Sequence, residues 1–478
     1  MDADYSELDA TALAALVSSG EASPAELVDE AIGRIEKLNP QLNAVIHERF
    51  EKARTEAGSA PDGPFRGVPI VIKDLDGFSA GDPFHGGMKV LKELGWTSDH
   101  DSYVIAKLRE AGCVIVGKTN CPELGLLPST EPETYGPTRN PWDLDRSPGG
   151  SSGGTAAAVA SRMVPLGHGG DGGGSIRTPA SMCGLVGLKP SRGRVSLGPD
   201  KGEAWQGLVV RGGLTRTVRD TAALLDAISG PMPGDPYFAA PPNRPFIQEV
   251  GSDPGSLRIG WATVAPGGLA QTDPQCATAV EGAMSALESL GHVVEDARPE
   301  AWAEEEITAH AINVISANLA FEIDSWSERT GKKIGEEDLE YHTWAFSEMS
   351  RALGAAQYIA SVDALQAVSR RVASWWSEGY DLLVTPTVPE PPWTFGSFTS
   401  SPENPLQGTL RSGQVVAFVA PWNLTGQPAI SLPLHWSEEG LPIGVQLVAA
   451  YGREDLLIRV ASQLEEARPW ADHRPPVS

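Results

Sequence analysis

The chain has little of what membrane or nucleic-acid binding requires. No segment approaches the roughly 18 consecutive apolar residues of a membrane span, and residues 1–5 are acidic and carry no basic-then-apolar secretion signal. Basic residues are outnumbered, with 37 Lys and Arg against 62 Asp and Glu, for a formal net charge of −25. Such a surface repels phosphate backbones and anionic lipids. We expect no nucleic-acid partner, no membrane partner and a cytoplasmic location.

Cysteine and histidine are also rare. Cys113, Cys121, Cys183 and Cys276 show no paired spacing, which is typical of buried free thiols in a reducing compartment. The nine histidines form no HExxH motif and no other metal-ligand spacing. We therefore expect no metal and no cofactor. His168 is the histidine nearest the glycine-rich segment described below, and we expect it to be structural.

Two motifs resemble known catalytic loops without the context that those loops need. Residues 112–119 (GCVIVGKT) match the phosphate-binding loop, but their middle four residues form a strand pattern, and Pro122 disfavours a following helix. Residues 150–154 (GSSGG) match the nucleophile elbow, which requires a preceding hydrophobic strand that residues 140–148 do not supply. We expect neither nucleotide binding nor an α/β-hydrolase elbow.

Helical and strand patterns alternate along the chain, which predicts an α/β fold. The proline-rich stretch 231–254 is interpreted as a surface excursion, so residues 1–478 are predicted to form one large domain. Short apolar runs predict strands at 69–72, 113–116, 292–295, 382–384, 429–432 and 444–448. Helices are predicted at 7–17, from a capping box at Ser23 to before Pro40, at 103–111, 156–160, 219–228 and 273–290, and over most of 302–376, with a long loop at 396–413.

A glycine-dense segment, residues 140–193, contains two serines in glycine-rich turns. Ser151 lies in GGSSGG and Ser175 in DGGGSIR. Because glycine is entropically costly, this density suggests backbone conformations that only glycine tolerates, usually near a ligand. A serine becomes a nucleophile only when a neighbour accepts its proton.

Lys73 is the candidate base. It follows the apolar run GVPIVI, so we expect burial to favour its neutral, proton-accepting form. Ser151 could then bridge Lys73 to Ser175. The alternative is a strand-end lysine paired with Asp74.

Three consecutive glycines precede Ser175. The amides of Gly172, Gly173 and Gly174 are unshielded by side chains, which predicts an oxyanion hole worth about 2.7–4 kcal/mol per donor. The alternative is a flexible glycine loop.

These motifs, in this order, resemble the amidase signature family, whose hallmark is a Ser–cis-Ser–Lys triad. The similarity runs over nearly the whole chain and includes residues 117–120, 136–142, 149–154, 170–180, 184–190, 217–220, 426–429 and 440–446. It implies a large twisted mixed sheet enclosed by helices. By resemblance, Ser175 is the acylating nucleophile, Ser151 (after a cis peptide bond) the bridge and Lys73 the base, and the oxyanion hole is formed by Gly172 to Gly174 with the Ser175 amide. Ser152, Asp171 and Arg177 are expected to support them.

The expected substrate is a small-molecule, uncharged amide, or a carbamate, cleaved at its C–N bond through an acyl-enzyme. Leu124, Gly125, Leu126, Leu127 and Tyr135 are expected near the substrate, with residues 300–420 covering the site. Many family members carry TDTGGS where this chain has GDGGGS, and the extra glycine at position 172 is expected to widen the pocket floor.

Two other functions are considered. A glutaminase subunit of a transamidation complex would need protein partners and a polar pocket, which the three leucines disfavour. An inactive fold acting as a binding module is disfavoured because all three triad positions are intact. For the oligomeric state we consider a homodimer.

Overall fold

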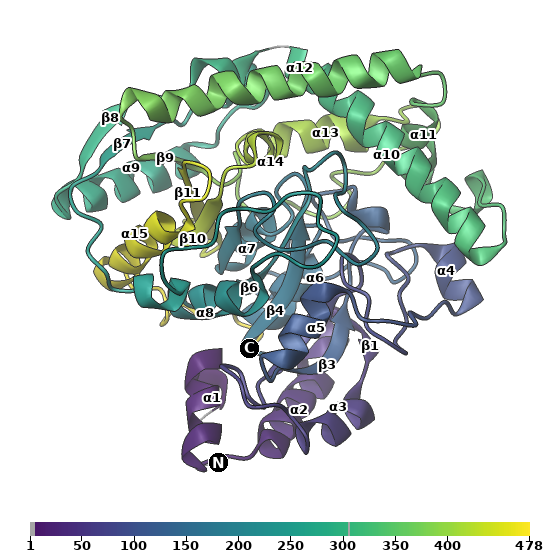
Figure 1. Cartoon of the computed structure of the whole chain (residues 1–478), viewed down its shortest axis with the longest axis vertical. Helices are drawn as coiled ribbons and strands as arrows, with labels where there is room; N and C mark the ends of the chain where they lie inside the picture. The colour runs from purple at the N-terminus through teal and green to yellow at the C-terminus, as the bar shows by residue number, and fades with distance from the viewer. Residues whose placement is uncertain (1–4, 305) are drawn as a thin grey trace.

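The computed structural model describes residues 5–304 and 306–478, and one eleven-stranded sheet forms its centre (Figure 1). The strand order is β1-β3-β2-β4-β6-β5-β10-β11-β9-β7-β8. The strands are β1 Val45–Glu48, β2 Pro69–Lys73, β3 Val114–Thr119, β4 Leu166–Asp171, β5 Val186–Lys189, β6 Val210–Thr215, β7 Arg258–Trp261, β8 Val293–Asp296, β9 Leu382–Pro386, β10 Ala429–Trp436 and β11 Pro442–Ala449.

The sheet is mixed, as predicted. β2 pairs in parallel with both β3 and β4, and β7 pairs in parallel with β8 and β9. The central strands from β4 through β6, β5, β10 and β11 to β9 are antiparallel. β2 and β9 are buried along their whole length. Strands buried on both faces read as short continuous apolar runs, which is why residues 69–72 and 382–384 were predicted from sequence.

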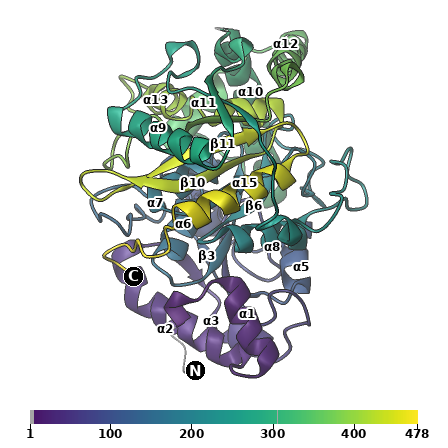
Figure 2. The same ribbon diagram turned by 90° about the vertical axis from the view of Figure 1, so that its left-hand side faces the viewer.

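Helices cover both faces of the sheet. Gly212 and Gly213 are consecutive in β6, so they point to opposite faces. A Cβ on Gly212 would meet Ile176, which precedes α7, whereas a Cβ on Gly213 would meet Leu224 of α8. α7 packs with α6, and α15 packs with α8 and α9; Figure 2 shows α8 and α15 along the sheet. The helices are α1 Ala10–Ser19, α2 Pro24–Leu42, α3 Phe50–Ala57, α4 Lys89–Leu94, α5 Tyr103–Glu110, α6 Gly153–Ala160, α7 Arg177–Cys183, α8 Val218–Ile228, α9 Pro274–Ser289, α10 Glu306–Thr330, α11 Tyr341–Glu348, α12 Ala355–Ser374, α13 Gln407–Val415, α14 Ala420–Thr425 and α15 Glu454–Ala467.

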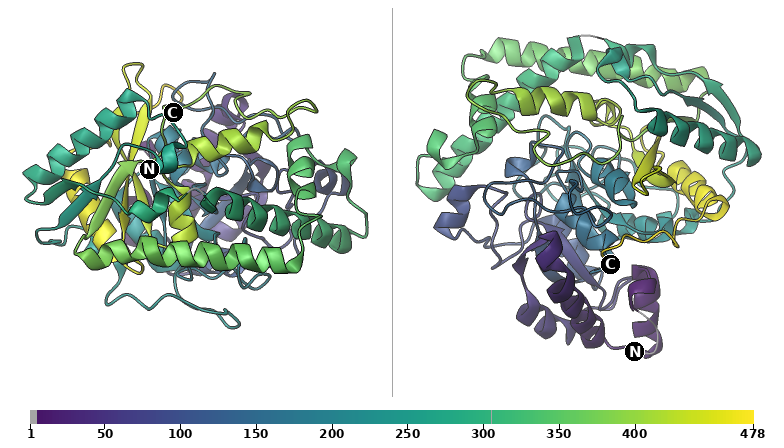
Figure 3. Two further views of the ribbon diagram at one scale, coloured as in Figure 1. Left: turned by 90° about the horizontal axis from the view of Figure 1, so that it is seen from above. Right: turned by 180° about the vertical axis from the view of Figure 1, so that it is seen from behind.

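The two ends of the molecule are built from different parts of the chain. α1, α2 and α3 form one end, and α10 to α14 gather at the other (Figure 1). Seen from above, the long helix α12 lies across this second end (Figure 3), where it packs against α10 and α14. None of the helices in the described residues is both long and apolar enough to cross a membrane.

The helix predicted to stop before Pro40 continues to Leu42. Its start is as predicted, since Ser23 and Glu26 form the capping box. Pro40 lies in the last turn, so the one intrahelical bond that its missing N–H removes is at the end of the helix and does not break its interior. The Asn39 side chain stabilises the chain reversal, because its Oδ1 accepts the amides of Ala44 and Val45.

The loop predicted at 396–413 is also partly wrong, because α13 begins at Gln407. Gly408 and Gly413 disguise the helix in the sequence. Gly408 is required there because a Cβ would lie 2.7 Å from the Phe398 carbonyl oxygen.

Candidate active site

Lys73 ends β2 with its side chain only 1% exposed. Its Nζ donates to Ser151 Oγ at 2.8 Å, which is the contact expected for a base acting through a bridging serine. The peptide bond between Gly150 and Ser151 is cis, as the resemblance predicted. The alternative prediction, that Lys73 pairs with Asp74, is wrong, because the carboxylate that pairs with Lys73 is that of Asp76, at 3.0 Å.

Asp74 belongs to a separate network. Its Oδ1 forms an ion pair with Lys118 Nζ at 2.7 Å, and both side chains are fully buried. Its Oδ2 accepts the amides of His85 and Gly86 and lies 3.4 Å from His47 Nε2. Burial alone would raise the pKa of Asp74, but the Lys118 ammonium and His47 lower it to about 2.

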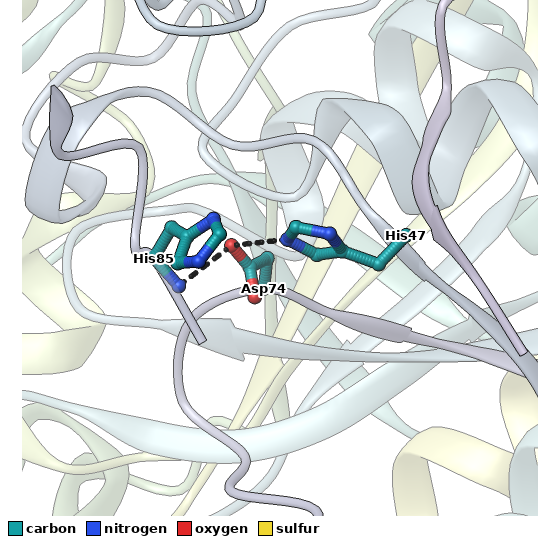
Figure 4. Close-up of side chains that lie close together, drawn as sticks. All are labelled: His47, Asp74 and His85. Atoms are coloured by element: carbon teal, nitrogen blue, oxygen red, sulfur yellow. Dashed lines mark hydrogen bonds and ion pairs between the residues drawn. The ribbon is translucent and has the colours of Figure 1, made fainter. Parts of the chain in front are cut away.

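The only metal-like cluster in the described residues is His47, Asp74 and His85, whose ligand atoms lie within 4.8 Å of one another (Figure 4). Both Asp74 oxygens already have partners. A divalent cation here would also share the one carboxylate with the buried Lys118 ammonium, and unbalanced buried charge is costly. The cluster is therefore better suited to holding the 83–86 loop against β2 than to binding a metal.

Asp76 and Arg211 flank Lys73 and were not singled out from the sequence. Asp76 Oδ1 pairs with Arg211 Nη1 at 2.8 Å. A Cβ on Gly170 of β4 would lie 2.2 Å from Asp76 Oδ2, so this glycine provides the space for the carboxylate. The only sequence signal is that Asp76 follows the base by three residues; Arg211 comes from β6, far away in the chain.

The turn that carries Ser175 is organised by Asp171. Its Oδ1 accepts the amide of Gly174 at 2.8 Å and its Oδ2 accepts that of Ile176 at 3.1 Å. Gly174 is therefore a poor oxyanion donor, because its amide is already bound. This corrects the predicted set: Gly172, Gly173 and the Ser175 amide remain as the candidate donors.

Arg177 neutralises Asp171 in the interior. Both side chains are fully buried and form two bonds, Nη2 to Oδ1 at 2.9 Å and Nε to Oδ2 at 3.0 Å. Burial alone would raise the pKa of Asp171, but the Arg177 guanidinium lowers it well below its usual range. Nη1 also reaches the Val419 carbonyl at 2.8 Å and Gln446 Oε1 at 2.7 Å, and Nη2 reaches Asn423 Oδ1 at 2.6 Å.

Ser152 links the two serine turns. Its amide donates to the Ser175 carbonyl oxygen at 3.2 Å, and its Oγ donates to the Gly170 carbonyl oxygen at 3.3 Å. A Cβ on Gly169 would lie 2.8 Å from Ser152 Oγ. The glycines of β4 thus serve close packing, rather than only the unusual backbone conformations that their density suggested.

Two cavities meet at Ser175. The polar cavity, about 70 Å³, is lined by Lys73, Asp76, Ser151, Ser175, Arg211, Lys201 and Glu322, among others. The apolar cavity, about 690 Å³, is lined by Ser175, Gly172, Gly173, Gly174 and mostly apolar side chains. Many of these side chains come from the expected covering region, including Trp302, Ile307, Ile312, Ile315, Phe346, Val368 and Val372.

Trp205 lines both cavities and corrects the expectation for Gly172. A Cβ at position 172 would lie 3.1 Å from the Trp205 ring and 3.1 Å from Val209 Cγ2. The Trp205 ring therefore fills the space next to Gly172 that a side chain at this position would occupy, and the pocket floor is not widened. Trp205 itself has a positive φ of 48°, which a large side chain rarely adopts.

Four of the five expected substrate-contacting residues line a cavity. Leu126 and Leu127 line the apolar cavity, Leu124 lines the polar one, and Gly125 lines both. Tyr135 lines neither. Its hydroxyl lies 2.5 Å from His85 Nδ1, and its ring packs against His47 and Lys92, so it is not retained as a substrate contact.

His168 of β4 is 1% exposed. Neither ring nitrogen has a hydrogen-bond partner within the described part of the chain. Burial and the Arg211 charge lower its pKa to about 3, so it is neutral at ordinary pH. All four cysteines are buried and free, as predicted.

The Amidase family model matches residues 26–458 of this chain. The 6-aminohexanoate-cyclic-dimer hydrolases of Pseudomonas sp. (strain NK87) and Paenarthrobacter ureafaciens are each 46% identical to it over 474 residues, covering 98% of this chain and 96% of theirs. A solved structure of 6-aminohexanoate cyclic dimer hydrolase complexed with substrate matches with a TM-score of 0.96 at 45% identity, covering 99% of both chains.

The fold and these similarities define the protein as an amidohydrolase. It belongs to the amidase signature family.

Proposed function

We propose that this enzyme hydrolyses uncharged amides, cyclic amides included, with Ser175 as nucleophile, Ser151 as proton bridge and Lys73 as general base. The observation that carries the proposal is the 2.8 Å bond from Lys73 Nζ to Ser151 Oγ, in a cavity that Ser175 also lines. This arrangement supplies a base without histidine.

The proton moves in one direction during acylation and back during amine release. Neutral Lys73 accepts the Ser151 proton while Ser151 accepts that of Ser175, whose Oγ bonds to the carbonyl carbon. As the C–N bond breaks, the proton returns through Ser151 to the leaving nitrogen. Water then attacks the acyl-Ser175 ester by the same route and releases the acid.

The developing oxyanion would be bound by the backbone. The amides of Gly172, Gly173 and Ser175 lie on the turn that Asp171 fixes through its bonds to Gly174 and Ile176. Donors held in place before the reaction need no reorganisation when the negative charge forms, which is why they stabilise the transition state.

The substrate class is inferred from the apolar cavity. Its volume of about 690 Å³ and mostly apolar lining favour a large, uncharged molecule. A cyclic amide dimer, for which the two 46% identical hydrolases are named, has no charged ends and fits this description. Carbamates form a second class, because they add only one oxygen at the carbonyl and follow the same mechanism.

The glutaminase-subunit alternative is disfavoured by the same cavity. Glutamine carries both an ammonium and a carboxylate, whereas the side chains next to Ser175 in the larger cavity, such as Leu126, Leu127 and Phe346, are apolar, and most of the charged residues lie in a cavity of only about 70 Å³. A cytoplasmic location and a homodimer remain proposals. Fractionation of the native cell and size-exclusion chromatography with light scattering test them.

The test is a substrate panel with purified enzyme and the Ser175→Ala variant as matched control. It contains 6-aminohexanoate cyclic dimer, an apolar p-nitroanilide, a carbamate ester of similar size, and glutamine. We expect turnover of the cyclic and apolar amides that the variant lacks. Glutamine hydrolysis without turnover of either amide would refute the proposal.

A further inference from the structure

We propose that Asp76 is a positioning residue for Lys73: paired with Arg211, it holds the lysine amine against Ser151 and sets the pH range in which that amine accepts a proton. This inference rests on the proposed function, because it assigns a partner to the base. Asp76 is not part of the Ser–Ser–Lys set, and it takes no proton in the reaction.

Asp76, with Arg211 behind it, holds Lys73 against Ser151, and we call this arrangement of side chains the clamp. Lys73 Nζ lies between Ser151 Oγ at 2.8 Å and Asp76 Oδ2 at 3.0 Å. The other oxygen of Asp76 is 2.8 Å from Arg211 Nη1. Since one carboxylate joins both cations, the position of Lys73 is tied through Asp76 to β6 as well as to its own strand.

The backbone is specialised for this contact. Asp76 has a φ of 72°, a left-handed conformation that costs energy for any residue with a Cβ. Gly170 leaves open the space in which a Cβ would lie 2.2 Å from Asp76 Oδ2. The left-handed backbone of Asp76 and the missing side chain of Gly170 therefore both contribute to the position of this carboxylate.

The charges around Asp76 keep it ionised. Burial alone would raise its pKa, but Arg211 and Lys73 lower it well below its usual range. It therefore stays an anion through the reaction, with one oxygen 3.0 Å from the Lys73 amine and the other 2.8 Å from Arg211 Nη1. The other charged or titratable groups that face this cluster are His168 from β4, Lys118 from β3, Asp74, Cys121, and Lys201 and Glu322 across the polar cavity.

Two substitutions test the clamp because they should move the pH–rate profile in opposite directions. Asp76→Asn removes the anion, so Lys73 becomes neutral more easily and the acid limb of kcat/KM should shift to lower pH by about 1–3 units. Arg211→Gln leaves Asp76 with Lys73 alone, so the limb should shift to higher pH. Asp76→Asn should also lower kcat, by less than the roughly 10²-fold expected on removal of the base.

Gly170→Ala provides a third variant that changes no charge. Its methyl group must push the Asp76 carboxylate aside, so we expect a smaller shift to lower pH. The matched control is Glu249→Gln, because Glu249 is likewise a carboxylate between two cations, Arg244 at 2.6 Å and Arg459 at 2.7 Å. Glu249→Gln should lower the melting temperature and leave the pH profile unchanged.

The outcomes separate this inference from the proposed function. Shifts of opposite sign for Asp76→Asn and Arg211→Gln support the clamp. Folded variants with the parent's pH profile overturn it, and so does a common shift of one sign. If one of the two does not fold, Gly170→Ala decides: a shift of its profile to lower pH supports the clamp, and an unchanged profile overturns it. An active Lys73→Ala enzyme would instead refute the proposed function itself.

Discussion

The buried pair of Asp171 and Arg177 offers the sharpest test of how the nucleophile turn is held. Arg177→Gln removes the counter-ion of a carboxylate that is fully buried. It also removes the bonds to Val419, Asn423 and Gln446. We expect a loss of stability and, because Asp171 holds the turn before Ser175, a loss of turnover as well.

The size of the effect follows from burial. Removing one partner of a buried ion pair costs about 3–5 kcal/mol, since the remaining charge is uncompensated. At about 2.1 cal/mol/K per residue, the unfolding entropy of this 478-residue chain is about 1 kcal/mol/K. The melting temperature should therefore fall by only about 3–5 °C, although the free-energy loss is large.

Differential scanning calorimetry measures this shift, and the double variant Asp171→Asn, Arg177→Gln is the control. The double variant leaves no buried charge without a partner, so it should recover part of the stability that the single variant loses. A single variant that melts within about 1 °C of the parent would refute the reasoning. The reasoning would also be refuted if the double variant lost as much stability as the single variants Asp171→Asn and Arg177→Gln lose together.

Four further predictions concern the site and the helices above it. Ser175→Ala should abolish turnover with a nearly unchanged melting temperature, and a serine-directed phosphonate should label only the Ser175 peptide by mass spectrometry. Lys73→Ala should lose at least about 10²-fold in kcat/KM, and Lys73→Arg should do no better because guanidinium accepts no proton. Burial raises the pKa of Glu340 to about 7, so its contribution to stability is present below its unfolded pKa near 4.5 and is lost as pH rises through 7. Urea unfolding should therefore show Glu340→Gln to be more stable than the parent at pH 8, by about 1 kcal/mol or more, and similar at pH 4. Trp205→Ala should raise kcat/KM for bulky amides relative to small ones, because Trp205 lines both cavities; an unchanged ratio would contradict that role.

The parts of the fold that were predictable have simple local signals. The apolar run before Lys73 and the capping box at Ser23 identify β2 and the start of α2. β4 and β6 were missed because LGHGGD and VRGGLT contain too few side chains to show a strand pattern. Their glycines are explained only by what packs against them.

The residues of the site also separate into those that the sequence predicted and those that it did not. Lys73, Ser151 and Ser175 were predicted because glycine-rich turns and the family resemblance mark them. Asp76 and Trp205 were not, because their roles depend on strands and loops that meet only in three dimensions. Gly174 is a residue whose predicted role the structure does not support. The sequence suggested that its amide is free to bind the oxyanion, whereas in the structure this amide donates to Asp171, three residues earlier.

The contacts of Arg177 also have a consequence for biosynthesis. The partners that complete its network, at positions 419, 423 and 446, are translated about 240 to 270 residues after it. A nascent chain on the ribosome therefore carries all three triad residues long before the turn around Ser175 can be completed. The enzyme should gain its activity late, only when nearly the whole polypeptide has left the exit tunnel.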